Sequence, residues 1–320
     1  MIIKHFVKVA PIILLFILFS CVPELPTNPR ETISDKMTLN CVLDPNSEKQ
    51  IMFLSRWFYC QGPISQYDCN SLDFNDWSVV GADIILSVGD DTLTAEEVML
   101  DDREKYRMNY LSYYQFSTRE IHPGQVWTVY ADHPDFNSIE ASTIVPDSVI
   151  FTTFPGDTFN TSANSLNFTW SRSSHTFGYL PFLILFCETE NTINQEFIYP
   201  IFNQEESSAI DTEPTVNNHV SYPIDEIMEQ IAYFWYDDWR WGNPEYYDRI
   251  YMRLKVISMD RALFNVQRYD YRPDESVAFS APLQIYSNVK NGGGIFGAMW
   301  TTYSKEIILP KRIINELLSR

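Results

Sequence analysis

The chain has 320 residues, of which 45% are hydrophobic and 15% aromatic, so it is long enough to build more than one hydrophobic core. Its 42 acidic residues outnumber its 23 basic residues, which gives a formal net charge of −19. A field of that sign disfavours nucleic acid and anionic lipid as partners, and it suits cations or basic peptides.

The first twenty residues have the pattern of a signal peptide. Lys4 and Lys8 are followed by an uncharged run from Val9 to Phe19. A run of roughly a dozen residues suits the apolar core of a signal peptide and is shorter than the ~20 residues that span a bilayer as a helix. We therefore expect residues 1–20 to be cleaved off.

The apolar run ends at Leu18-Phe19-Ser20-Cys21, which resembles a lipobox. Leu18 and Ser20 fit the pattern, whereas Phe19 is bulkier than the usual residue. We expect Cys21 to carry the lipid and to hold the protein to a membrane, since several acyl chains at about 0.8 kcal/mol per buried methylene give stable anchoring. The alternatives are an ordinary signal peptide with an unrelated cysteine, or an uncleaved anchor helix.

Residues 21–36 are predicted to form a tether. Pro23, Pro26 and Pro29 exclude a helix and favour an extended chain. Fully extended, this segment reaches on the order of 50 Å, which is enough to hold a folded body clear of the lipid headgroups.

Residues 37–146 are predicted to form an N-terminal β-sandwich domain. Candidate strands, each ended by turn residues, cover residues 37–43, 50–57, 79–88, 110–116, 125–131 and 138–145. Short alternating strands with a turn about every dozen residues are typical of a sandwich.

Residues 147–289 are predicted to form a second β domain. Candidate strands cover residues 148–154, 165–170, 178–187 and 249–258. A strand that ends in Trp170, a short polar link and then Gly178-Tyr179 resemble the core of fibronectin type III domains, in which the tryptophan packs between two sheets.

A helix over residues 223–235 is predicted as an insertion in this domain. Apolar side chains recur there at a spacing of three to four residues, and Pro223 suits the first turn. Residues 290–320 are predicted to contain a glycine-rich turn at Asn291–Gly297 and a short amphipathic helix after Pro310. The glycine-rich segment lacks the Lys-Ser/Thr of a phosphate loop, so we interpret it as a turn or a close backbone approach.

The cysteines other than Cys21 form no CxxC motif. Cys60 and Cys69 flank a turn-rich loop and are candidates for a disulfide, which forms outside the cytoplasm. Cys41 and Cys187 lie in apolar strand-like segments, where a buried free thiol is the default.

An aromatic segment after the predicted helix is the best candidate for a binding surface. Its residues Trp239, Trp241, Tyr246 and Tyr247 lie in a Gly-Asn-Pro loop with acidic neighbours. Exposed aromatic rings stack on sugars or form protein-binding hot spots. The alternative is that these rings pack in the core.

No pattern for catalysis, a metal or a cofactor is present. His122, His133, His175 and His219 lack metal-ligand spacing, and neither HExxH nor GxSxG occurs. The acidic pairs Asp90-Asp91, Glu96-Glu97 and Asp101-Asp102 surround one predicted hairpin. Adjacent acids in a strand point to opposite faces, which favours a solvated edge over a calcium site or a glycosidase. We therefore expect a protein that is not an enzyme and has no cofactor.

Several short motifs in the order of the chain resemble one family. They are Cys21, Asn40–Pro45, Val80–Ile84, Gly124–Val129, Ala141–Pro146 and Ser287–Ala298. They are similar to a domain-of-unknown-function lipoprotein family of Gram-negative envelopes, which often accompanies TonB-dependent outer-membrane receptors. The resemblance implies a lipoprotein anchored to the outer membrane, with such a receptor as a partner and no established catalytic residue. Only Glu24 is acidic close after Cys21, so the periplasmic and the surface face both stay open.

Together these observations predict a non-catalytic envelope lipoprotein with two β-sandwich domains of the Ig or fibronectin III type and one or two short helices. Its expected role is ligand binding, or an accessory function, in outer-membrane nutrient uptake. The alternatives are a surface adhesin or structural lipoprotein, and a carboxylate-dependent glycoside hydrolase.

Overall fold

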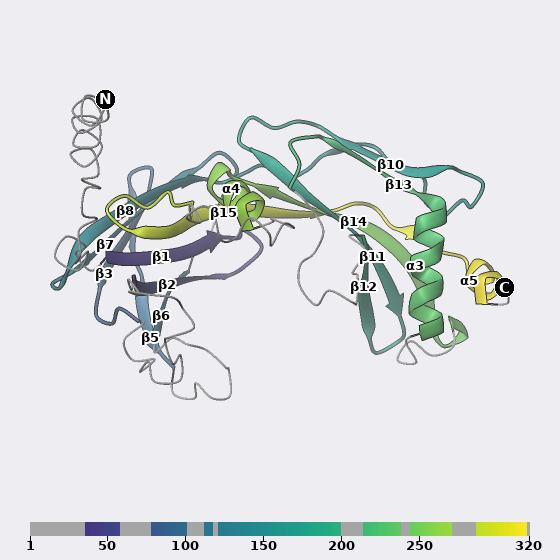
Figure 1. Cartoon of the computed structure of the whole chain (residues 1–320), viewed down its shortest axis with the longest axis horizontal. Coiled ribbons are helices and arrows are strands. Elements are labelled where there is room, and N and C mark those ends of the chain that lie inside the picture. Colours follow the sequence, from purple (N-terminus) through teal and green to yellow (C-terminus); the bar gives the residue numbers. More distant parts are fainter. Residues whose placement is uncertain are drawn as a thin grey trace, which may run out of the picture. The chain divides into compact units, whose positions relative to one another are not determined.

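The computed structural model of the protein describes residues 36–57, 78–100, 112–117, 121–199, 214–237, 244–270 and 286–318 (Figure 1). The chain divides into Met1–Asp35 and a compact unit, Lys36–Arg320, and all described residues belong to the second. The predicted signal peptide, Cys21, the tether up to Asp35, and Cys60 and Cys69 therefore lie outside the described residues. No helix within the described ranges is long and apolar enough to cross a membrane.

Strands dominate the described residues, which confirms the prediction of a mainly β fold. The strands are β1 (Lys36–Leu43), β2 (Lys49–Trp57), β3 (Asp83–Val88), β4 (Asp91–Thr94), β5 (Glu96–Met99), β6 (Ser112–Ser117), β7 (Val126–His133), β8 (Phe136–Ile144), β9 (Phe151–Thr153), β10 (Ser165–Trp170), β11 (Gly178–Glu188), β12 (Ile193–Tyr199), β13 (His219–Pro223), β14 (Arg249–Met259), β15 (Gly293–Tyr303) and β16 (Ile307–Ile308). The helices are α3 (Ile224–Asp237), α4 (Arg261–Asp270) and α5 (Lys311–Leu318), with a 3-10 turn, η5 (Pro244–Tyr246). The sequence pattern predicts α3 and α5 but not α4.

The N-terminal part is a β-sandwich around one hydrophobic core. A four-stranded sheet of order β4-β3-β7-β8 packs on the part of a larger sheet that contains β1, β2, β6 and β5. In β1, Met37, Leu39, Cys41 and Leu43 all face this core. Side chains two apart share a face of a strand, and burying each large apolar side chain contributes about 2 kcal/mol.

Residues from Val149 onward build a second core. Strands β11 and β14 of the large sheet pack there against a three-stranded sheet of order β13-β10-β9 and against α3 and α5. Trp170, at the end of β10, is buried, and its ring meets that of Tyr179 edge-on with 5.3 Å between the ring centroids. The predicted packing of this tryptophan between two sheets is confirmed.

Strand β11 is buried from Gly178 to Cys187 because both of its faces are covered. Leu183, Leu185 and Cys187 face the second core, and Phe182 and Ile184 face a third cluster that includes α4. Such a continuous apolar run is typical of a strand buried on both faces.

Strand β15 belongs to both halves of the large sheet. Its first half, Gly293 to Ala298, pairs in parallel with β1, and its second half, Met299 to Tyr303, pairs antiparallel with β14. Figure 1 shows β15 running from the side of β1 to the side of β14. The glycine-rich segment Asn291–Gly297, expected to be a turn or a close backbone approach, is therefore mostly the start of a central strand.

The expected close backbone approach in this segment is present at Gly294. Its φ is +89°, and a Cβ atom there would lie 2.1 Å from the carbonyl oxygen of Leu39 in β1. Only glycine tolerates both the positive φ and this contact. Phe296, two residues on, is fully buried in the first core.

Helices α3 and α5 lie where the sequence predicts helices. Pro223 is the last residue of β13, where it lies opposite Ser165 of β10, and α3 begins at the next residue. In α5, Ile313 and Ile314 are buried in the second core, as expected for a docked amphipathic helix.

Candidate functional site

The aromatic segment does not form one binding face among the described residues. Trp239 and Trp241 lie outside them. Tyr246 is 75% exposed, but Tyr247 is 6% exposed and packs in the second core. Tyr246 is the last residue of η5 and Tyr247 directly follows it. The side chains of the two neighbours point to solvent and to the core respectively, so the assignment of Tyr247 to a binding face is corrected to core packing.

The buried cysteines match their predicted structural role. Cys41 and Cys187 are both free and buried. Burial raises the pKa of each thiol to about 12, since the thiolate would lose its hydration. Neither thiol is therefore a nucleophile near neutral pH.

The two acidic pairs that lie among the described residues do not converge on a site. Asp90 and Asp91 are exposed at the β3–β4 turn, whereas Glu96 and Glu97 lie on β5, which belongs to the other sheet. Asp101 and Asp102 lie outside the described residues. In the part of the chain that is described, no group of three His, Cys, Asp or Glu side chains could hold a metal ion.

A cavity of about 450 Å³ lies between the N-terminal sandwich, the β10–β11 loop and the start of α4, and we call it the seam groove. Ligand sites often form where two domains or packed layers of a protein meet. The N-terminal sandwich contributes β7 and β8 to its lining, and the other half contributes the β10–β11 loop and the start of α4. Its lining includes Val126, Thr143, Ile144, His175, Phe177, Asp260, Arg261 and Asn288.

Asp260 is the buried acid of the seam groove. One carboxylate oxygen accepts a hydrogen bond from the Leu263 amide at 2.9 Å, which makes Asp260 the N-cap of α4. The other accepts from the Thr143 hydroxyl of β8 at 2.7 Å. Burial raises the pKa of Asp260 above its ordinary value, and these hydrogen bonds oppose the rise.

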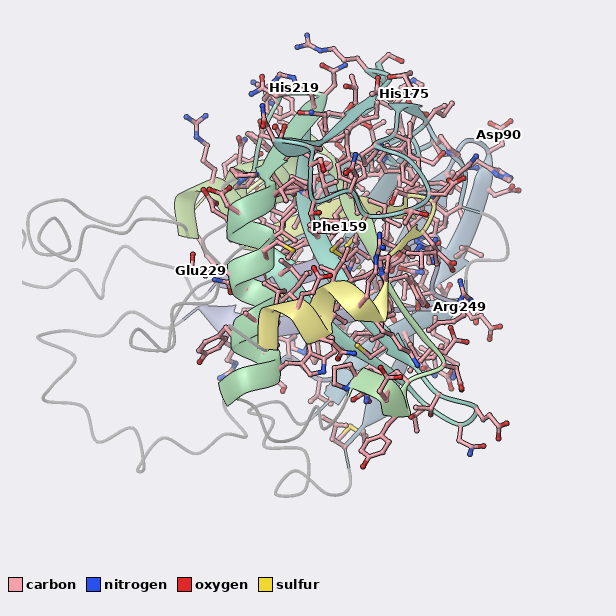
Figure 2. The ribbon with its side chains drawn as sticks, turned by 90° about the vertical axis from the view of Figure 1, so that its right-hand side faces the viewer. Asp90, Phe159, His175, His219, Glu229 and Arg249 are labelled. Carbon is pink, nitrogen blue, oxygen red and sulfur yellow. The ribbon has the colours of Figure 1, made fainter. Side chains whose placement is uncertain are left out.

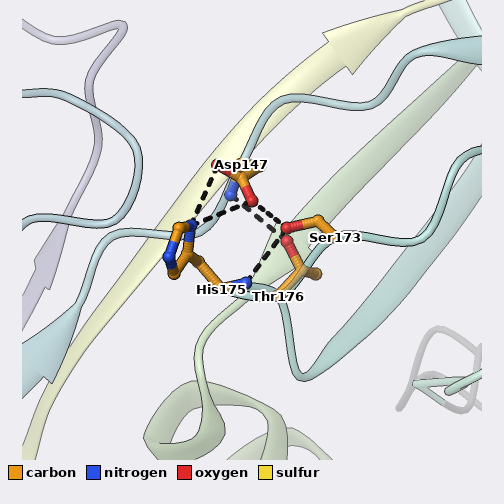
Figure 3. A network of polar contacts seen from close by, with 4 residues as sticks. All are labelled: Asp147, Ser173, His175 and Thr176. Carbon is orange, nitrogen blue, oxygen red and sulfur yellow. Dashed lines mark hydrogen bonds and ion pairs between the residues drawn. The ribbon is translucent and has the colours of Figure 1, made fainter.

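A polar network holds the β10–β11 loop against the chain after β8 (Figure 3). His175 Nδ1 lies 3.2 Å from a carboxylate oxygen of Asp147, and the Ser173 hydroxyl donates to the same carboxylate. The Asp147 amide donates to the Thr176 hydroxyl at 3.2 Å. The ring of His175 also lies against Gly124, where a Cβ would approach its Cε1 to 2.8 Å.

This network contains Ser, His and Asp but does not have the geometry of a catalytic triad. In a triad the imidazole lies between the two other groups and accepts the proton of the serine hydroxyl. Here the Ser173 hydroxyl donates to Asp147 directly, and its oxygen accepts from the His175 backbone amide at 3.1 Å. The arrangement positions the loop and the imidazole, and it does not activate the serine.

Apolar and cationic groups meet at the mouth of the seam groove. Arg261 Cζ lies 5.4 Å from the centroid of the Phe177 ring, a cation–π distance. Phe177, Val126 and Ile144 are each about half exposed although they are apolar. Such exposed apolar groups beside a cation form a surface suited to a ligand with an apolar part and an anionic or hydrogen-bonding part.

Asn288 fixes the floor of the groove. Its side-chain amide donates to the carbonyl oxygens of Phe296 at 2.8 Å and Ser142 at 3.1 Å, and its Oδ1 accepts from the Phe296 amide at 3.0 Å. It therefore links β15 to β8 much as a neighbouring strand would.

Sequence reasoning does not identify this groove. Asp147, Phe177, Asp260 and Arg261 receive no role from their local pattern, and His175 is considered only as a metal ligand. One signal was available, because Asp260 before an amphipathic run is the N-cap signature of a helix.

Comparison with known families classifies the chain. The model of a family described as a domain of unknown function, DUF4249, matches residues 22–305. The chain belongs to this family. The DUF4249 match includes every residue of the seam groove and ends before α5.

Other comparisons add little to the DUF4249 assignment. No curated protein matches the sequence. Among solved structures, the crystal structure of chicken CNTN1 FN1-FN3 domains aligns at 6% identity and a TM-score of 0.23, covering 69% of this chain and 63% of that one. The chain therefore spans less than two thirds of the length of that structure.

Proposed function

We propose that this DUF4249 protein is a lipid-anchored, non-catalytic binding protein of the cell envelope that holds its ligand in the seam groove. Its role would be capture or accessory contact in nutrient uptake at the outer membrane, with a TonB-dependent receptor as partner. The observation that carries the proposal is the groove itself, where Arg261, Phe177 and half-exposed aliphatic side chains converge.

The polar groups around the groove support binding rather than turnover. Both carboxylates near it already accept hydrogen bonds from the protein, Asp260 from Thr143 and Asp147 from Ser173. A carboxylate hydrolase needs one acid to donate a proton and a second to activate water or attack. Neither acid is placed for these roles while it caps a helix or holds a loop.

The envelope location is supported by the N-terminal sequence. The DUF4249 match begins at Val22, one residue after Cys21, the residue with which a processed lipoprotein would begin. The acidic composition suits a soluble body held away from anionic headgroups.

The binding role can be tested by calorimetry on the full-length protein with panels of glycans and short peptides. We expect one panel to contain a ligand, and Arg261→Gln to weaken its binding about tenfold, the effect of losing one charged contact. Arg268→Gln is the matched control, since Arg268 is exposed on the same helix outside the groove. Turnover of a panel member, or binding that Arg261→Gln leaves unchanged, would reject the proposal.

The accessory role requires a separate measurement. A TonB-dependent receptor encoded beside this protein should co-purify with it, and deletion of this chain should reduce uptake of the receptor's substrate. Normal uptake with defective cell adhesion would favour the adhesin instead.

A further inference from the structure

A second cavity, of about 700 Å³, lies between α3 and α5, and we call it the helix groove. It shares no lining residue with the seam groove. Figure 2 looks onto this face, with α5 (yellow) beside α3 (green) and Glu229 labelled on α3.

Each helix turns one side toward the helix groove. Asp225, Met228, Glu229 and Ala232 of α3 line it, and their spacing of three, four and seven residues places them on one face. This face is adjacent to the buried face of α3, so Met228 and Ala232 are only partly covered. Leu317 of α5, also partly covered, adds to the apolar floor.

Three carboxylates line the helix groove, those of Asp225 and Glu229 on α3 and that of Glu316 on α5. Within the described ranges neither Asp225 nor Glu229 forms an ion pair, whereas Glu245 pairs with Lys311 and Glu140 with Lys290. Asp225 lies in the first turn of α3, where the helix dipole stabilises it. Glu229 lies one turn further along, beyond the range of that effect.

We propose that the helix groove docks a short basic amphipathic segment of a partner protein. Its aliphatic side chains would pack on Met228, Ala232 and Leu317, and its lysine or arginine side chains would pair with Asp225 and Glu229. Grooves between helices accept amphipathic segments in this way, with apolar anchors in the floor and charges at the rim.

The acidic charge of the groove favours a basic segment over the other occupants of an apolar groove, namely lipid and a second copy of this chain. Anionic lipid would meet the carboxylates of Asp225 and Glu229 and be repelled. A second copy of this chain carries the same formal charge of −19 and would also be repelled. A basic segment is attracted by both the local rim and the overall field.

The test uses the full-length chain in nanodiscs of neutral lipid and a fluorescein-labelled synthetic helical peptide of leucine and lysine. Anisotropy should show binding of this peptide and none of the matched leucine–glutamate or serine–lysine peptides. The double variant Asp225→Asn/Glu229→Gln should weaken binding about tenfold, from two ion pairs at the edge of the groove. Asp90→Asn/Asp91→Asn removes the same charge at the exposed β3–β4 turn and should leave binding unchanged.

The floor is tested separately by Met228→Ala, which should weaken binding of the leucine–lysine peptide while thermal unfolding shows that the fold is kept. Hydrogen exchange should show that the bound peptide protects α3 and α5. Equal weakening in the two charge variants would mean attraction by net charge alone and would overturn the proposal. Absence of binding, or equal binding of the serine–lysine peptide, would overturn it as well.

Discussion

The Thr143 hydroxyl donates a hydrogen bond of 2.7 Å to the Asp260 carboxylate, and this bond ties the N-terminal sandwich to the first turn of α4. Both side chains are buried. Asp260 also donates its backbone amide to the Ala298 carbonyl of β15 at 3.0 Å. One residue thus contacts β8, α4 and the strand shared by the two halves of the large sheet.

Replacing Thr143 with valine should lower the free energy of unfolding by about 1.5–3 kcal/mol, because a buried carboxylate loses a donor and keeps its desolvation cost. Chemical denaturation measures the change. Thr128→Val on β7 is the matched control, since Thr128 is half-buried and should shift stability by less than about 0.5 kcal/mol. Equal losses in the two variants would show that the methyl-for-hydroxyl change, and not the bond to Asp260, is responsible.

Asp260→Asn should change the pH dependence of stability. The folded-state pKa of Asp260 is raised above 3.8, so its favourable contribution is full below that pH and is lost as the pH rises through the folded pKa. Asparagine keeps the cap and carries no charge. The stability of the variant relative to wild type should therefore increase as the pH rises from about 4 to 7.

Denaturation series over this pH range compare wild type, Asp260→Asn and Asp90→Asn. The last removes one negative charge at an exposed turn and should not show the same trend. A constant difference between wild type and Asp260→Asn across the range would contradict burial as the cause.

Elements whose pattern is local could be predicted from the sequence. Strands such as β1 and β10 show their alternation within a few residues, and α3 shows its helical spacing. Strand β15 does not, because its glycines resemble a turn and its partner β1 lies at the opposite end of the chain. Pairing over such a distance leaves no local signal.

The seam groove could not be predicted for the same reason. It is assembled by packing from the β7–β8 hairpin, the β10–β11 loop and the start of α4, and these three segments are far apart in sequence. The aromatic segment shows the converse, because two neighbouring tyrosines in a local cluster have different environments, with Tyr246 exposed and Tyr247 buried.

Gly294→Ala should strongly destabilise the fold. The added Cβ would meet the Leu39 carbonyl at 2.1 Å and the residue would need a φ of +89°. We expect a loss of more than about 3 kcal/mol, since backbone strain of about 1–3 kcal/mol adds to separation of the central β1–β15 pair.

Gly89→Ala separates the strain of a positive φ from the contact of the added Cβ with a neighbouring strand. Gly89 also has a positive φ, +58°, but a Cβ there meets nothing within 4 Å. This variant should lose only about 1 kcal/mol, from the conformation alone. Thermal unfolding of both variants gives the comparison, and equal losses would mean that the contact with β1 contributes nothing.

The lipid anchor is tested by metabolic labelling with palmitate. Wild type should take up label and Cys21→Ser should take up none, because the thiol of Cys21 is the proposed acceptor. Cys41→Ser is the matched control, since Cys41 is a buried free thiol and its loss should leave labelling unchanged. Label on Cys21→Ser equal to that on wild type, or an unlabelled wild type, would remove the anchor and with it the proposed place of the protein at the outer membrane, while leaving the two grooves as binding sites of a soluble body.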